Sequence, residues 1–278
     1  MGPPLIPPDA IYRRAERGFR FRQYLLVSVA ATGPMQFSDD IEFSHRDRKD
    51  IYQYVERYGT VDYEDARRAL NMSPEAFGHH VAVLRRDGIL ARTDDDLRVA
   101  FEDDTEETYV DEGLEVTIRQ AREEDLTGLV GAIREALSDR NYIEGESIAD
   151  VVESENVLLR HNEVRSRVFF VATVHGDVVG WVHLNAPELR KLRHTAELTV
   201  GVIDEYRGHG IGTKLLERAV DWALDNGFEK LYNSVPATNE EATAFLEERG
   251  WDTEAVRADH YKIGDDYVDE VMMATRLD

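Results

Sequence analysis

The chain contains no cysteine among its 278 residues. Disulfide bonds, a thiolate nucleophile and cysteine-ligated zinc are therefore excluded. The chain also lacks a run of about 20 apolar residues long enough to span a bilayer, and its N-terminus lacks the basic-then-apolar pattern of a signal peptide. These absences predict a cytoplasmic protein with no membrane partner, and no metal site is predicted.

Positive charge is scarce, since 33 lysines and arginines stand against 56 acidic residues, a net charge of −23. Residues 1–100 carry 15 basic and 16 acidic residues, whereas residues 101–278 carry 18 and 40. Such an acidic surface either attracts cationic partners or keeps a protein hydrated in a high-salt cytoplasm. Because the acidic residues are spread over many segments, we favour a halophilic, acidic protein.

The length of the chain predicts about two domains, and an apolar content of 42% is enough to form their cores. Residues 1–45 form an N-terminal arm whose structure the sequence leaves open. Four prolines at its start favour an extended conformation, and five arginines follow between Arg13 and Arg22. A basic arm that binds nucleic acid and an arm that packs on the protein or on a second subunit are both compatible with this pattern.

Residues 46–101 show the spacing of three short helices followed by a β-hairpin. Asp62 is a candidate N-cap of the second helix, and Ser73 followed by Pro74 is typical of the start of the third. This order resembles a winged helix-turn-helix domain, a small α+β fold. The resemblance implies DNA binding through the third helix, or self-association without DNA. The recognition positions would include His79, His80, Arg85 and Arg86.

Residues 102–113 are dominated by acidic side chains and end at Gly113. Such a charge run is typical of a solvated segment, and its like charges disfavour packing of Tyr109 and Val110. We therefore predict an acidic linker at 102–113, with the domain boundary inside it. Residues 114–278 then alternate between strand and helix patterns, which predicts an α/β domain.

One stretch of this second domain has the pattern of a phosphate-binding turn. A strand from Glu197 to Ile203 passes through a glycine-rich turn into a helix that begins near Gly210. Glycines let backbone amides approach an anion, the helix N-terminus adds unpaired donors, and Arg207 adds a positive charge. A dinucleotide fingerprint would need glycine at Thr213 or Leu215, and the P-loop order is absent. An ordinary tight turn that needs glycine is the alternative.

The pattern Arg-x-x-Gly-x-Gly after a strand resembles the pyrophosphate motif of the GNAT (Gcn5-related N-acetyltransferase) superfamily. A second match runs from Val235 through Asn239 to Gly250-Trp251. The resemblance implies a mixed, mostly antiparallel sheet with flanking helices over 114–278, and acetyl-CoA as cosubstrate without a metal. It also implies cofactor contacts from Val202, Ile203, Arg207, Gly208, His209, Gly210, Ile211, Gly212, Thr213 and Asn239.

The implied reaction is direct transfer of an acetyl group, within a ternary complex, to a primary amine. The acceptor is a protein lysine, a protein N-terminus or a small amine. The amine must first lose a proton, and Glu197 is the candidate base, although it is equally compatible with an ordinary strand residue. Many family members carry a tyrosine where this chain has Leu246, so Tyr232 becomes a candidate acid. The alternative is a winged-helix transcription regulator that uses acetyl-CoA as an effector.

Overall fold

The computed structural model describes residues 41, 43–100, 105–137, 143–162, 165–187, 189, 191–263 and 265–277. Of the arm predicted at residues 1–45, all but residues 41 and 43–45 lie outside the described residues. In the described chain, no helix combines the length and the apolar character needed to cross a lipid bilayer.

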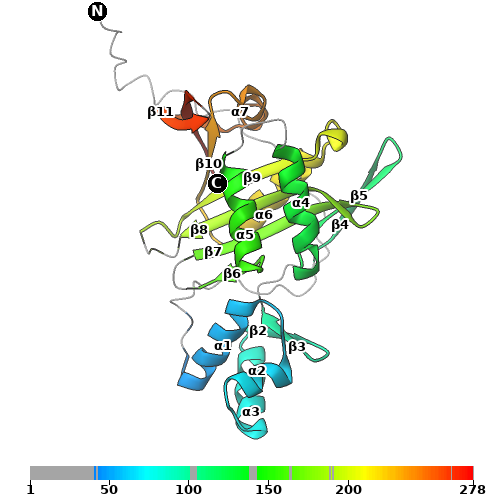
Figure 1. The fold of residues 1–278 in the computed structure, drawn as a ribbon, viewed down its shortest axis with the longest axis vertical. Helices are drawn as coiled ribbons and strands as arrows, with labels where there is room; N and C mark the ends of the chain where they lie inside the picture. Colours follow the sequence, from blue (N-terminus) through cyan, green and yellow to red (C-terminus); the bar gives the residue numbers. More distant parts are fainter. Residues whose placement is uncertain are drawn as a thin grey trace, which may run out of the picture. The chain divides into compact units, whose positions relative to one another are not determined.

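The N-terminal part of the described chain forms three helices and a small sheet (Figure 1). The sheet has the strand order β1-β3-β2, and both neighbouring pairs are antiparallel. Its core contains residues of all three helices and of β2 and β3. The elements are α1 (Arg46–Tyr58), β1 (Val61–Asp62), α2 (Tyr63–Ala69), α3 (Pro74–Arg86), β2 (Leu90–Thr93) and β3 (Asp96–Val99).

Local sequence signals determine where these helices begin. The Asp62 side chain accepts a hydrogen bond from the amide of Asp65, and the Ser73 hydroxyl accepts one from the amide of Ala76. Both N-caps were predicted. His80 differs from its expected place on an exposed recognition surface. It is buried, because its ring packs against that of His45, with centroids 4.6 Å apart.

The rest of the described chain builds a sheet of nine strands in the order β11-β12-β10-β9-β8-β7-β5-β4, with β6 paired to β7. The β9–β10 pair is parallel and the other pairs are antiparallel, so the predicted mixed, mostly antiparallel sheet is confirmed. The strands are β4 (Glu107–Asp111), β5 (Leu114–Gln120), β6 (Arg160–His161), β7 (Arg165–Val174), β8 (Asp177–Pro187), β9 (Thr195–Val202), β10 (Lys230–Pro236), β11 (Asp252–Ile263) and β12 (Asp266–Arg276).

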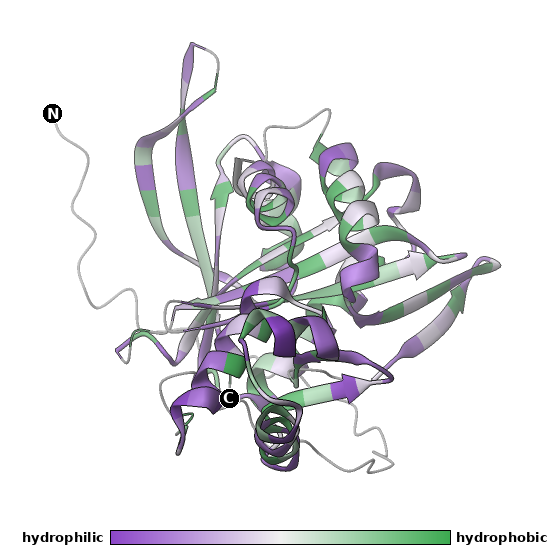
Figure 2. Ribbon diagram, turned by 60° about the horizontal axis from the view of Figure 1, so that its bottom comes forward, coloured by the Kyte–Doolittle hydropathy of each residue, from purple (hydrophilic) through white to green (hydrophobic). Residues whose placement is uncertain are grey.

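Helices cover both faces of this sheet. Helices α4 (Leu126–Leu137) and α5 (Ile143–Glu155) pack on one face around a core that includes Trp181. Helix α6 (Ile211–Asp225) packs on the other face, and α7 (Glu240–Glu247) follows β10. Because both faces are covered, β7 and β8 are buried along almost their whole length. Figure 2 shows the hydrophobic residues running along these strands and along the helices that cover them.

The predicted acidic linker is wrong for residues 107–113. Residues Glu107–Asp111 form strand β4, which pairs with β5 in an antiparallel hairpin at the edge of the sheet. The hydroxyls of Thr108 and Thr117 lie 3.0 Å apart across the two strands, and Tyr109 packs against the main core. Pairing with β5 leaves the acidic side chains in solvent, so the dense negative charge does not prevent the strand.

Candidate active site

The sheet opens between β9 and β10. The two strands pair only from Thr195–Lys230 to Glu197–Tyr232, and within the described residues no pairing between them continues beyond that point. The facing edges of residues 198–201 and 233–236 therefore keep backbone amide and carbonyl groups for another partner. An extended ligand that carries amides can occupy this wedge as a strand would.

A cavity of about 390 Å³ extends from this wedge to the N-terminus of α6. Its walls come from β9, β10, the turn that precedes α6, the start of α6 and helix α7, and residues of β8, α4 and α5 complete them. It is lined by eight of the ten predicted cofactor contacts: Val202, Arg207, Gly208, Gly210, Ile211, Gly212, Thr213 and Asn239.

The turn before α6 is open around its backbone. Gly208 and Gly210 have φ angles of 86° and 74°, in the left-handed region that favours glycine. A Cβ atom placed on either residue would meet no heavy atom within 4 Å. Gly210 caps α6 without a side-chain hydrogen bond, so the first amides of a 15-residue helix face the cavity entrance. The geometry suits a phosphate or pyrophosphate group.

Arg207 has a structural role as well as a charge. Its Nε donates to the carbonyl of Val202 at 3.1 Å, which holds the end of β9. Its terminal nitrogens lie 2.7 Å from the carboxylate of Asp204 and 3.6 Å from that of Glu241. Two carboxylates therefore offset its charge, and the backbone amides of the turn carry more of the anion attraction than the sequence indicated.

A second arginine lines the cavity and was not predicted. The guanidinium of Arg249 lies 3.8 Å from the ring centroid of Phe245 and donates to the hydroxyl of Thr213 at 2.8 Å. It also donates to the Phe245 carbonyl at 2.6 Å. The position of Arg249 directly before Gly250-Trp251 was the available signal, but only the packing of α7 against α6 places it beside the phosphate turn.

Two predicted cofactor contacts do not line the cavity. The amide of Ile203 donates to the carbonyl of Val179 at 2.9 Å, and its side chain is buried beneath α4 and α5. The ring of His209 points to strand β4, where its Nδ1 lies 2.8 Å from the carboxylate of Asp111. Ile203 and His209 were expected to contact the cofactor because of their positions in the motif. Neighbouring strands determine what the two residues contact in the structure.

The remaining walls of the cavity combine apolar side chains with polar residues such as Thr199, Asn233 and Ser234. Leu246, which stands where a tyrosine is common in the superfamily that the motif resembles, is buried against the cavity. The indole of Trp181 occupies the space beside Gly201, where a Cβ would lie 2.3 Å from the ring. Any side chain at Gly201 would displace this indole. Asn239 caps α7, with its side chain accepting from the amide of Ala242 at 3.1 Å.

The two candidate catalytic residues lie side by side at the base of the wedge. Glu197 and Tyr232 are Cα partners in the last paired positions of β9 and β10. Asn185 faces Glu197 from β8, and Arg167 faces Asn185 from β7, so the four residues form one row across four strands. Paired residues project to the same face of a sheet, which puts this row beneath α5.

A second cavity, of about 160 Å³, lies over this row. Glu197, Asn185 and Arg167 line it together with His183, Arg165 and three residues of α5. Burial lowers the pKa of His183 to about 3, and the charges of Arg167 and Arg165 act in the same direction. Burial also lowers the pKa of Arg167 to about 10, although Glu155 opposes this shift. His183 is therefore neutral and Arg167 charged at neutral pH.

The N-terminal part holds the one group of potential metal ligands in the described chain. Atoms of His45, Asp47 and His80 lie within 4.8 Å of one another. The Nδ1 of His45 already accepts from the amide of Asp47 at 3.1 Å, as the N-cap of α1. The sequence did not indicate this cluster, because its members come from two separate helices.

Comparison with known proteins agrees with this geometry. Residues 131–251 match the family model described as "Acetyltransferase (GNAT) family". An N-alpha-acetyltransferase of Saccharolobus solfataricus is 28% identical over 165 residues, covering 56% of this chain and 92% of the relative. An N-alpha-acetyltransferase of Sulfurisphaera tokodaii is 28% identical over 166 residues, covering 55% of this chain and 90% of the relative.

The fold is also similar to that of solved structures. A probable acetyltransferase from Staphylococcus epidermidis ATCC 12228 matches with a TM-score of 0.50 at 18% identity. The match covers 59% of this chain and 99% of that chain. This likeness concerns the fold of the sheet and its helices.

Proposed function

We propose that this protein, an acetyltransferase of the GNAT family, transfers the acetyl group of acetyl-CoA to the α-amino group of a protein N-terminus. The observation that carries the proposal is that strand β9 lines both cavities, with Glu197 in the smaller one and residues 199–202, which follow it along the strand, in the larger one. The two relatives named N-alpha-acetyltransferase favour a protein N-terminus over a lysine or a small amine.

The large cavity fits acetyl-CoA. The amides at Gly208, Gly210 and the start of α6 would hold the pyrophosphate, and the edges of β9 and β10 would bond the amides of the pantetheine arm. Val202 and Asn239 line this path. When bound, the cosubstrate supplies an activated acyl group as a thioester.

The residues at the base of the wedge would handle the protons. The α-ammonium group of a protein N-terminus titrates at about 7.7–8.0, so most of it is charged at neutral pH and it needs a base, a role that we assign to Glu197. An amide on the open edge of β9 would donate to the carbonyl oxygen as charge develops there. Tyr232, beside Glu197, would protonate the departing thiolate, a task for which Leu246 has no hydroxyl.

We also propose that residues 46–99 form a winged helix-turn-helix domain. The element order and the three-stranded sheet support this proposal. His79 lies exposed within α3, and Arg86, the last residue of α3, is also exposed. His80 is buried and unavailable to DNA. A transcription regulator that responds to acetyl-CoA is the competing function, and it predicts no turnover.

Thioester consumption with a panel of acceptors tests the proposal. We expect a peptide with a free α-amino group to react faster than the same peptide with a blocked N-terminus and an internal lysine, and faster than a polyamine. Glu197→Gln should lower kcat/KM by about 10²–10⁴-fold, because glutamine cannot accept the proton. Raising the pH should partly restore the rate by supplying free amine.

Glu115→Gln is the matched control, because Glu115 is an exposed strand glutamate on β5 outside both cavities. Its kinetics should equal those of the wild type. Faster reaction of the lysine peptide or the polyamine would contradict the assigned acceptor. A fully active Glu197→Gln variant would contradict the assigned base.

A further inference from the structure

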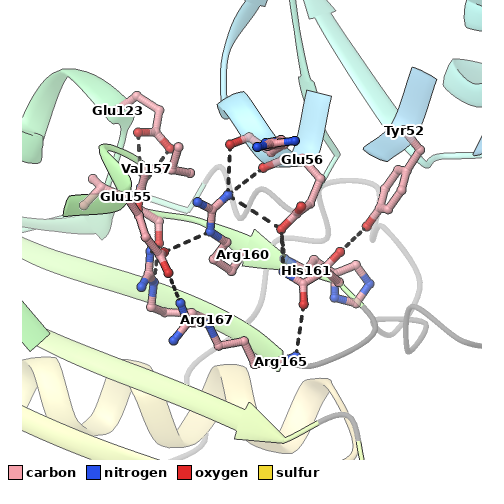
Figure 3. Close-up of polar contacts among 12 residues, drawn as sticks. Tyr52, Glu56, Glu123, Glu155, Val157, Arg160, His161, Arg165 and Arg167 are labelled. Atoms are coloured by element: carbon pink, nitrogen blue, oxygen red, sulfur yellow. Dashed lines mark hydrogen bonds and ion pairs between the residues drawn. The ribbon is translucent and has the colours of Figure 1, made fainter. Parts of the chain in front are cut away.

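A buried group of charged side chains joins the N-terminal part of the protein to the acetyltransferase sheet (Figure 3). The N-terminal contribution comes from α1. The hydroxyl of Tyr52 donates to the carbonyl of His161 at 2.6 Å. The carboxylate of Glu56 accepts from the side-chain amide of Asn162 at 2.9 Å.

Arg160 of β6 inserts its guanidinium at the C-terminal end of α1. Its Nη1 donates to the carbonyls of Glu56 at 2.9 Å and Arg57 at 3.2 Å. These are among the last carbonyls of a helix, which attract a cation. Leu159 packs against the core of the N-terminal part. Helix α1 therefore fixes the segment between α5 and β7 through both polar and apolar contacts.

Glu155, the last residue of α5, links this contact to the sheet. Its carboxylate accepts from Arg160 at 3.0 Å and from Arg167 at 2.9 Å, and it also pairs with Arg165. Burial alone would raise the pKa of Glu155, but Arg167, Arg160 and Arg165 together hold it below its usual value. One ionised carboxylate thus holds three guanidinium groups.

The same arginines form a wall of the smaller cavity. Arg165 and Arg167 line it next to Glu197, and α5 supplies Ser147, Ile148 and Val151 to the opposite side. Glu155 therefore anchors both walls, since it ends α5 and holds both arginines. The larger cavity includes none of these charged residues in its lining.

We infer that helix α1 positions the acceptor cavity, with Tyr52 and Glu56 as positioning residues for the acceptor amine. This inference rests on the proposed function, in which the smaller cavity receives the acceptor. Without the charge of Glu56, whose carboxylate lies 3.8 Å from Nη1 of Arg160, this arginine would be drawn more strongly to Glu155, and the partly buried carboxylate of Glu155 would redistribute its hydrogen bonds among the three arginines. The cavity walls would shift together, while the wedge between β9 and β10 would keep its shape.

Steady-state kinetics of the full chain with a free-N-terminus peptide tests this inference. Glu56→Gln removes the charge beside Arg160 but keeps an oxygen that can accept from Asn162, and Tyr52→Phe removes the hydrogen bond to His161 but keeps the ring, so both variants preserve the packing. We expect the double variant to raise KM for the peptide by about 2- to 30-fold, the usual range of coupling between distant sites. KM for acetyl-CoA should stay unchanged. Glu75→Gln, an exposed glutamate of α3 with no such contact, is the matched control.

Hydrogen exchange supplies a readout that does not need turnover. The amides of residues 157–161 and 165–167 should exchange faster in the double variant, with those of 198–202 unchanged. A wild-type protein that acetylates no peptide would defeat the proposed function, and hydrogen exchange would still test the coupling. If the double variant turns over with an unchanged KM for the peptide, or if KM for acetyl-CoA rises as much as KM for the peptide, this inference is overturned. The proposed function would still stand in either case.

Discussion

At this site, the role of a single residue depends on the side chains that neighbouring segments place beside it. Gly201 shows this most directly, because the indole of Trp181 from β8 occupies the space that any side chain would need. Arg207 is an example that involves charge. Its guanidinium donates a hydrogen bond to the Val202 carbonyl, and two nearby carboxylates offset its positive charge. A residue in a motif thus carries a structural task together with its functional one.

His183 gives a residue-scale prediction for stability against pH. It is 5% exposed, its ring lies 4.6 Å from that of Phe169, and burial lowers its pKa to about 3. An unfolded histidine titrates near 6.5, so between these values the unfolded state binds a proton that the folded state does not. The free energy of unfolding should therefore fall by about 1.4 kcal/mol per pH unit below pH 6.5 on account of this residue.

Urea denaturation between pH 7.5 and 5 measures this slope. His183→Phe should remove that part of the pH dependence, because phenylalanine stacks on Phe169 and does not titrate. His194→Phe, at an exposed turn before β9, should keep the wild-type slope. An unchanged slope in His183→Phe would mean that His183 is not held neutral in the folded protein.

At the scale of elements, the site depends on one strand-turn-helix unit and on the strands beside it. The β9-turn-α6 unit supplies the anion cradle, and the departure of β10 from β9 supplies the wedge. Strand β4 adds a contact from the edge of the sheet. The hydroxyl of Tyr109 donates to the carbonyl of His209 at 3.3 Å, and Asp111 holds the His209 ring. A segment predicted to be a linker therefore supports the turn that precedes α6.

The turn before α6 gives the element-scale prediction. Gly210→Ala should weaken coenzyme A binding by about tenfold or more, because a Cβ would stand between the amides and the anion and cost one charge-assisted hydrogen bond. It should also cost about 1 kcal/mol of stability, since alanine is strained at φ 74°. Dephosphorylated pantetheine should bind the variant and the wild type alike.

Gly227→Ala is the matched control for this substitution. Gly227 follows the other end of α6 with a φ of 78°, and a Cβ there would also meet no heavy atom within 4 Å. Calorimetric titration should show a similar loss of stability in both variants and a loss of coenzyme A affinity only in Gly210→Ala. Equal affinity in both would remove the turn from the binding site.

The whole molecule carries a charge imbalance that neither cavity explains. Its net charge is −23, and residues 1–100 account for 15 basic against 16 acidic residues. The acidic surplus therefore falls on residues 101–278. Such a charge destabilises a compact protein through self-repulsion, and dissolved salt screens it.

Thermal denaturation in increasing KCl tests the interpretation of salt adaptation. We expect Tm to rise steeply up to about 0.5 M KCl. At that concentration the Debye length is about 4–5 Å, so most of the repulsion between surface charges is screened. A protein adapted to high salt should gain further stability between 1 and 3 M. A Tm that stays level across the whole range would show that the surface charges do not repel one another enough to matter.

The sequence by itself determined what depends on neighbours along the chain. The N-caps at Asp62 and Ser73, the order of strands and helices from residue 114 onward, and the glycine turn that begins α6 were all predicted, because capping and backbone freedom are local properties. Of the ten cofactor contacts that the resemblance implied, eight line the large cavity: seven come from the motif around Arg207, and Asn239 comes from the second match.

Only the tertiary structure decided what depends on contacts between distant segments. It placed residues 107–111 in a strand, because β5 offered hydrogen bonds that outweigh local charge repulsion. The His209 ring contacts Asp111 of β4, and Ile203 is buried and donates its amide to Val179 of β8, so a neighbouring strand determines the place of each residue. The tertiary structure also brought Glu197 beside Tyr232 and gave Glu155 three arginines from β6 and β7. Strand pairing and helix packing bring these residues together across separations that no local pattern in the sequence records.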